Sequence, residues 1–279
     1  MNYFLTKGTV PAKAVHEFKK WEITTNHGLK LRTWVVVYDD KSHLQLTNID
    51  FYSLLSNGHK NRDEEIQIEE IKEICNEKDL FLIEDAAHAH GSSIDNKHAG
   101  SLGDVGCFSF YPTKPMTSGE GGIITTNDEK ITEFAKIVRH HGKEGSEHTK
   151  IGYNWRMSEI NAILGVYQLN RLDEFVEKRN KIATRYVEEL NDMNDLSLIS
   201  VPSDIVHSFW KYPILLNSIK ASHLEKIFRE KYEIALGTIY YPPIHLQPFY
   251  KEKFGNRPGM LPVSEDVLLR ETCLPIFVC

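Results

Sequence analysis

The chain has 279 residues, of which 41% are hydrophobic and 26% are charged, and its formal net charge is -6. This composition is that of an ordinary globular protein, and it lacks the basic patch of a nucleic-acid-binding surface. No apolar run approaches the roughly 20 residues that cross a bilayer, and the N-terminal sequence does not have the layout of a signal peptide. The cysteines form no C-x-x-C pair, which favours free thiols in a reducing cytoplasm. They are Cys75, Cys107, Cys273 and Cys279.

The first 60 residues carry weak signals. AKAVHEFKKWEI (12–23) is interpreted as a helix and RTWVVVYDD (32–40) as a short strand. EEIQIEEIKEICNEKD (64–79) has the spacing of an amphipathic helix. Its apolar side chains fall mostly on one face: Ile66, Ile68, Ile71, Ile74 and Cys75.

Three short apolar runs follow and are interpreted as strands. They are LFLIE (80–84), CFSFY (107–111) and GIITT (122–126). The first is typical of a buried parallel strand, and the other two are rich in aromatic and β-branched residues. Helix, strand, loop, strand, turn and strand in this order predict an α/β sheet covered by helices.

Two helices are predicted next. Asp128 is expected to cap a helix through EKITEFAKIVRHH (129–141). A longer helical pattern starts near Ser158 and is expected to continue as far as Leu190. Its apolar stripe consists of Ile160, Ile163, Leu164, Tyr167, Leu172, Phe175 and Val176.

The remaining sequence predicts a smaller α/β unit. WKYPILL (210–216), a helix near 218–231 and EIALGTIYY (233–241) alternate there. We therefore predict two domains, 1–190 and 191–279.

Asp85 lies in EDAAHAHG (84–91), directly after an apolar run. In open α/β sheets, ligands bind beyond the carboxyl ends of the strands, where a carboxylate can meet a buried cation. Capping of the following turn is an equally good interpretation, because aspartate is common at such positions.

Lys114 lies in SFYPTKPMTSGEGG (109–122), between a predicted strand and a glycine-rich turn. Most lysines are exposed surface charges, but desolvation favours a neutral amine, which can attack a carbonyl and form a Schiff base. Gly119, Gly121 and Gly122 allow a close backbone approach to a ligand. An imine-forming lysine together with an aspartate for a ring nitrogen is what pyridoxal 5′-phosphate (PLP) requires.

Two other groups of residues have simpler interpretations. His140, His141 and His148 lack the carboxylate or cysteine pattern that completes a metal site, so we predict surface or loop roles and no metal. Cys107 is interpreted as a small buried hydrophobic residue and not as a nucleophile.

From about residue 62 onward the sequence resembles the DegT/DnrJ/EryC1/StrS family of PLP-dependent sugar aminotransferases. YYPPIHLQPFY (240–250) and CLPIF (273–277) are similar to the small domain of that family. The other matching motifs occur in the family's order: EDAAHAHG (84–91), GSLGDVGCFSFYPTK (100–114), GEGGIITTND (119–128), RHHG (139–142) and GYNWRMSEINAILGVYQLNRLDEF (152–175).

The resemblance implies roles for individual residues. Lys114 matches the lysine that binds the cofactor covalently and moves the substrate proton, and Asp85 matches the carboxylate on the pyridine nitrogen. His88 stands beside the cofactor ring and its phenolic oxygen, and Ser109 matches a phosphate-binding serine. Asn154 matches the asparagine that reaches the cofactor phosphate of a neighbouring subunit, which implies a homodimer with shared active sites.

Arg156 and Glu120 lie inside matched motifs and are candidate substrate-binding residues. Arginine suits bidentate phosphate contacts, although a structural salt bridge is an equal alternative for Arg156.

The implied fold is an α/β large domain of the aspartate aminotransferase type (fold type I), incomplete at its N-terminus, with a smaller C-terminal α/β domain. The implied reaction moves an amino group from glutamate or glutamine to a nucleotide-linked keto-sugar, for cell-surface polysaccharide or secondary-metabolite sugars. Sugar dehydratases of the family have histidine in place of the lysine, so Lys114 favours amino transfer.

Residues 1–60 lack the phosphate-binding segment and the ring-stacking aromatic residue that the family has ahead of EDAAHAHG. The nearest string, SNGH (56–59), lies too close to that motif. We interpret residues 1–60 as a diverged or truncated part of the large domain. The alternative function is therefore that of a truncated, catalytically impaired relative, acting as a binding partner or as a non-functional remnant.

Overall fold

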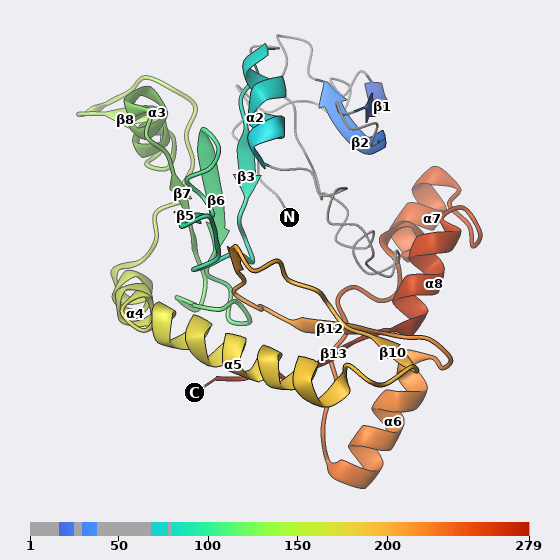
Figure 1. Ribbon diagram of the computed structural model, residues 1–279. Helices are drawn as coiled ribbons and strands as arrows, with labels where there is room; N and C mark the ends of the chain where they lie inside the picture. Colours follow the sequence, from blue (N-terminus) through green and yellow to red (C-terminus); the bar gives the residue numbers. More distant parts are fainter. Residues whose placement is uncertain (1–16, 25–29, 38–67, 78–79, 279) are drawn as a thin grey trace. The chain divides into compact units, whose positions relative to one another are not determined.

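The computed structural model describes residues 17–24, 30–37, 68–77 and 80–278 (Figure 1). Contacts divide these residues into two compact units, the first ending at Leu172 and the second beginning at Asp173. Helix α5 (Leu172–Leu190) thus falls almost entirely in the second unit. The division into domains at residue 190 stays a prediction.

The central sheet of the first unit has the strand order β3–β6–β7. Strand β3 (Ile83–Asp85) is parallel to β6 (Val105–Ser109), and β7 (Gly122–Thr125) is antiparallel to β6. The three strands lie side by side in Figure 1. All three predicted strands are present, although β3 begins later and β6 earlier than the apolar runs suggested.

Helix α2 (Ile68–Glu77) packs beside β3. Ile71, Cys75 and Leu82 form a small buried cluster that joins the helix to the start of the strand. The amphipathic helix is therefore confirmed over these residues, while 64–67 and 78–79 lie outside the described part of the chain.

Strands β1 (Glu17–Thr24) and β2 (Lys30–Val37) form an antiparallel hairpin. The strand at 32–40 is confirmed as far as Val37, but the helix predicted for 12–23 is wrong over its described part. All eight β1 residues pair with β2, and this pairing outweighs a local helical pattern. The short strands are β4 (Ser93–Ile94), β5 (Lys97–His98), β8 (Lys143–Glu144) and β9 (Glu147–His148).

The predicted N-cap Asp128 is confirmed, and Ser158, near which the next helix is predicted to start, is found to be an N-cap as well. Asp128 caps α3 (Glu129–Val138), and its Oδ1 accepts hydrogen bonds from the N–H groups of Lys130 at 2.6 Å and Ile131 at 3.2 Å. Ser158 caps α4 (Glu159–Leu169) through the N–H of Asn161 at 3.2 Å. These side chains satisfy backbone donors that a helix start leaves free.

The long helix predicted from Ser158 to Leu190 is two helices. Helix α4 ends at the C-cap Asn170, and α5 starts at Leu172. The apolar stripe divides at the same point, because Leu172, Phe175 and Val176 are buried whereas Ile160 and the other α4 members are exposed. A continuous apolar pattern therefore concealed a helix end.

The second unit is built on an antiparallel sheet of β10 (Leu196–Ser197), β12 (Tyr212–Leu216) and β13 (Glu271–Leu274). The strand predicted at 210–216 and the helix near 218–231, α6 (Ala221–Tyr232), are confirmed. EIALGTIYY contributes only a bridge at Gly237 to Cys273. The other elements of the second unit are β11 (Ile205–Val206), the 3-10 helix η2 (Ile244–Leu246), α7 (Pro248–Phe254) and α8 (Pro262–Arg270).

The core of the second unit forms between its sheet and its helices. Tyr212, Ile214 and Leu216 of β12 are buried with Ala183 of α5 and Ala221 of α6. Among the described residues, no helix is both long and apolar enough to cross a membrane.

Candidate active site

Strand register places Asp85 and Ser109 on one face of the central sheet. Asp85 ends β3 and pairs with Cys107 of β6, and Ser109 lies two positions further along β6. Side chains alternate between faces, so Asp85, Cys107 and Ser109 share one. Because β3 and β6 are parallel, both carboxyl ends meet at the same edge, where α/β sheets bind ligands.

The Asp85 carboxylate is exposed at this edge. Its Oδ1 accepts a hydrogen bond from the N–H of Ala87 at 3.2 Å. The turn-capping interpretation is therefore correct for one oxygen. No described residue donates to Oδ2, which stays available for a ligand, so the two interpretations of Asp85 are compatible.

Glu84 points to the opposite face and has a structural role. Its Oε2 accepts from the N–H of Gly100 at 2.7 Å. Its Oε1 accepts from the N–H groups of Leu102 and Gly103, each at 2.6 Å. The carboxylate thus holds the loop ahead of β6. Adjacent acidic residues in the sequence therefore serve different faces of the sheet.

Glu84→Gln is expected to lower the free energy of unfolding by about 2 kcal/mol, because a charged acceptor of three N–H groups becomes an amide. Urea denaturation measures the change. Glu133→Gln is the matched control, since Glu133 forms a surface ion pair with Lys136 and its side chain is 64% exposed. Equal stability of both variants would show that Glu84 does not hold the loop.

Lys114 lies half-buried in a loop that hydrogen bonds anchor at both ends. Its N–H donates to the carbonyl of Tyr111 at 3.0 Å. The carbonyl of Phe110 accepts from the N–H of Ser118 at 3.0 Å and from the Thr117 hydroxyl at 2.8 Å. These bonds fix the position of the loop relative to the end of β6.

Glycine is required where this loop returns to β7. Gly121 has φ +154°, and a Cβ there would lie 2.7 Å from Met157 Cε and 2.8 Å from Ser118 Oγ. Glu120 is exposed, and its backbone carbonyl accepts from Asn161 Nδ2 at 2.9 Å. The loop is therefore tied to α4 through the Glu120 backbone.

Burial shifts the pKa of two titratable side chains near the site, Cys107 and His90. Desolvation first, and then the charges of Asp85 and Glu84, raise the pKa of the Cys107 thiol. A neutral thiol fits the prediction that Cys107 is not a nucleophile. Burial lowers the pKa of His90 to about 4, and the nearby charge of Lys114 acts in the same direction. His90 is therefore neutral near pH 7, packed against Phe108 and Phe110.

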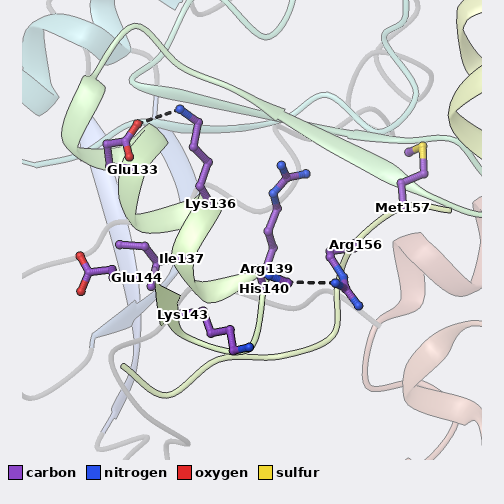
Figure 2. Close-up of a pocket in the computed structure, with 9 residues that line it drawn as sticks. All are labelled: Glu133, Lys136, Ile137, Arg139, His140, Lys143, Glu144, Arg156 and Met157. Carbon is purple, nitrogen blue, oxygen red and sulfur yellow. Dashed lines mark hydrogen bonds and ion pairs between the residues drawn. The ribbon is translucent and has the colours of Figure 1, made fainter. Parts of the chain in front are cut away.

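Asn154 and Arg156 lie together beyond α3. Asn154 forms a backbone bridge with His140, and its Oδ1 accepts from Arg156 Nη2 at 3.4 Å. Arg156 Nη1 is 3.1 Å from His140 Nδ1 (Figure 2). Because arginine only donates, Nδ1 accepts and the ring proton lies on Nε2. The alternative of a structural salt bridge for Arg156 finds no carboxylate partner in the described residues.

The structure also places the remaining predicted residues. His88 is half-buried in the turn after β3. His140 and His141 follow the end of α3, with ring centroids 5.7 Å apart, and His148 Nδ1 lies 2.8 Å from the His141 carbonyl. The described residues hold no group of three metal-ligating side chains. Cys75, Cys107 and Cys273 are free thiols.

The residues at the edge of the sheet fit PLP by their chemistry. Asp85 offers a carboxylate for a protonated ring nitrogen, Lys114 an amine, and Ser109 a hydroxyl for phosphate. Asp85 and Ser109 lie on one face, with the Lys114 loop directly after β6. The roles of these residues, and of His88, Asn154, Arg156 and Glu120, stay predictions.

Solved structures share this fold. A DegT/DnrJ/EryC1/StrS aminotransferase from Brucella abortus aligns with a TM-score of 0.67 at 32% identity, over 76% of this chain and 56% of that one. PseC from Helicobacter pylori, an aminotransferase in pseudoaminic acid biosynthesis, aligns with a TM-score of 0.66 at 30% identity, over 76% and 58%. The chain thus has the α/β architecture of PLP-dependent enzymes of fold type I, as predicted.

The chain belongs to the DegT/DnrJ/EryC1/StrS aminotransferase family, whose model matches residues 64–279. The family is PLP-dependent, which confirms the predicted cofactor class.

Two curated relatives support this assignment. One is an uncharacterised protein of Methanocaldococcus jannaschii, 37% identical over 76% of this chain and 58% of that protein. The other is GDP-perosamine synthase of Escherichia coli O157:H7, 33% identical over 75% and 57%. The chain therefore spans little more than half the length of these relatives. The predicted features of residues 1–16 and 38–60, the string SNGH included, lie outside the described residues.

Sequence reasoning missed two candidate functional residues and one structural residue beside the site. Glu84 was not separated from Asp85, although strand alternation alone sets them on opposite faces. Arg139 and Lys143 were also missed. The stretch from Arg139 to Lys143 contains two cations and two histidines without an acidic residue, which is a detectable basic cluster.

Proposed function

We propose that the chain is a PLP-dependent aminotransferase that moves an amino group from glutamate or glutamine to a nucleotide-linked keto-sugar. The pathway would be cytoplasmic and would supply cell-surface polysaccharide or secondary-metabolite sugars. The observation that carries the proposal is the common edge of the sheet where Asp85 and Ser109 end parallel strands and the Lys114 loop follows.

Relatives indicate the substrate class. They include GDP-perosamine synthase of Escherichia coli O157:H7 and a dTDP-3-amino-3,4,6-trideoxy-alpha-D-glucose transaminase of Micromonospora megalomicea, the latter 32% identical. These names denote enzymes whose sugars are linked to different nucleotides. They support a nucleotide-linked sugar as substrate here and do not select one nucleotide.

In the proposed reaction, each residue has a defined task. PLP, when bound, supplies a ring that withdraws electrons from the substrate carbon. Asp85 holds a proton at the ring nitrogen, because a nearby carboxylate favours the charged form. The Lys114 amine takes a proton from the substrate carbon and returns it as a general base and acid. Ser109 donates its hydroxyl to phosphate, and His88 lies beside the ring.

The proposed assembly is a homodimer in which Asn154 reaches the cofactor phosphate of the second copy. Its support is the exposed apolar surface of α4, where Ile160 is 80% and Tyr167 69% exposed. Such contiguous apolar surface is typical of an interface. Ile160→Glu combined with Tyr167→Glu is expected to shift the protein from dimer to monomer in sedimentation. A parent chain that sediments as a monomer at micromolar concentration would contradict the dimer.

Covalent trapping tests the proposed function. The purified chain is mixed with PLP and reduced with borohydride, and the modified peptide is identified by mass spectrometry. We expect one pyridoxyl group per chain, on Lys114. Modification spread over surface lysines, or none, would contradict the proposal and would favour the alternative of a non-catalytic relative.

A further inference from the structure

A pocket of about 600 Å³ lies in the first unit, outside the edge that carries Asp85 and Ser109. Its walls come from the second half of α3, from β8 and from the segment of Arg156 and Met157 (Figure 2). Its volume is in the range of small-molecule sites, about 300–1,000 Å³. It is therefore large enough for a group bigger than a single carboxylate.

Three cations that line this pocket have no acidic partner among the described residues. Lys136 is paired with Glu133 at 2.7 Å, and Glu144 is paired with Lys150 at 3.5 Å. Arg139, Lys143 and Arg156 form no ion pair with a carboxylate anywhere in the described part of the chain. Both acidic side chains of the pocket are therefore already engaged, and the pocket keeps an excess of positive charge.

Neutral acceptors hold the Arg156 guanidinium in place. It donates to His140 Nδ1 at 3.1 Å and to Asn154 Oδ1 at 3.4 Å. Neither contact removes its charge, and part of its donor fork stays available. Partial desolvation, followed by the charges of Arg156, His141, Lys143 and Arg139, lowers the pKa of His140. His140 therefore acts as a neutral acceptor beside a concentrated positive charge.

The pocket borders the loop that carries Lys114. Met157 lines the pocket, and its Cε lies 2.7 Å from the place where a Cβ of Gly121 would be. Asn161 of α4 holds the Glu120 carbonyl of the same loop at 2.9 Å. A ligand in the pocket would therefore lie next to the segment that the proposed reaction uses.

We propose that this pocket binds the diphosphate of the nucleotide-linked sugar, with Arg139, Lys143 and Arg156 contacting its oxygens. The inference rests on the proposed function and deepens it. A diphosphate linking a sugar to a nucleoside carries two negative charges, whereas the side-chain carboxylate of an amino donor carries one. Three unpaired cations match the former better, and arginine forks suit phosphate oxygens.

Calorimetric titration of the full chain with pyrophosphate and with UDP, GDP and dTDP tests the site. Pyrophosphate isolates the charge contribution from any base recognition. Arg156→Gln removes the charge but can still donate to His140, and we expect it to weaken pyrophosphate binding at least tenfold, as does Arg139→Ala. Lys136→Ala is the matched control, since Lys136 lines the same pocket but is already paired with Glu133. We expect the pyrophosphate affinity of Lys136→Ala to stay within twofold of that of the parent chain.

Borohydride trapping on Lys114 in the same variants separates the two proposals. The diphosphate site is supported if every variant still traps PLP on Lys114, while Arg156→Gln loses pyrophosphate affinity and Lys136→Ala keeps it. The diphosphate site is overturned if PLP is still trapped on Lys114 but all chains bind pyrophosphate equally well, or if the parent chain does not bind it. The proposed function would remain valid in both cases. Circular dichroism confirms that each variant is folded.

Discussion

Lys114→Ala is expected to abolish covalent retention of PLP and to slow amino-group removal from glutamate by about 10²–10⁴-fold, the usual contribution of one positioned acid–base group. The reason is that the Lys114 loop is anchored through the Phe110 carbonyl at the end of β6. Lys114→Ala therefore removes the amine that this loop holds in place. The absorbance of retained PLP after gel filtration and the initial rate of 2-oxoglutarate formation are the two readouts.

A small added amine sharpens this prediction. Ethylamine can replace the missing base, so the rate of Lys114→Ala should rise with ethylamine concentration, whereas a folding defect would not be rescued. Lys130→Ala is the matched control, because Lys130 is exposed in the first turn of α3. If Lys114→Ala still retained PLP after borohydride reduction, the assignment of Lys114 as the residue that binds PLP covalently would be contradicted.

Asp85→Asn is expected to slow the same half-reaction by about 10- to 1,000-fold. A neighbouring opposite charge shifts a pKa by about 1–3 units, and each unit corresponds to about tenfold in an equilibrium. Asparagine cannot stabilise a charged ring nitrogen in this way. Asp85→Asn should still hold PLP covalently on Lys114. The substitution should therefore lower the reaction rate without abolishing cofactor binding.

Glu84→Gln is the informative comparison for Asp85→Asn. Glu84 is adjacent in sequence but holds Gly100, Leu102 and Gly103 on the opposite face. We expect it to lower stability while the rate per folded chain is unchanged. An unchanged rate in Asp85→Asn, or equal rate losses in both variants, would contradict the assignment of the two faces.

Local sequence signals predicted the elements whose stabilising contacts are local. Asp128 and Ser158 cap their helices with their own side chains, so the helix starts could be read from the sequence. The hairpin of β1 and β2 could not, because eight cross-strand pairs decide it. The end of α4 at Asn170 was also missed, since no glycine or proline marks it.

The candidate site shows the same limit. Motifs supplied Lys114, Asp85 and Ser109, and strand alternation explains why Asp85 and not Glu84 lies on the face of Ser109. The basic pocket needed the structure. The backbone bridge between His140 and Asn154 brings Arg156 beside the end of α3, and no local pattern encodes that pairing.

The most direct measurement of the proposed amino transfer is a single-turnover reaction that requires no knowledge of the sugar. The chain is loaded with PLP, freed of excess cofactor and mixed with glutamate or glutamine in the absence of any acceptor. The proposal predicts about one equivalent of keto acid per bound cofactor, after which product formation stops. Covalently held PLP on Lys114 that yields no keto acid from either donor would contradict the proposed amino transfer.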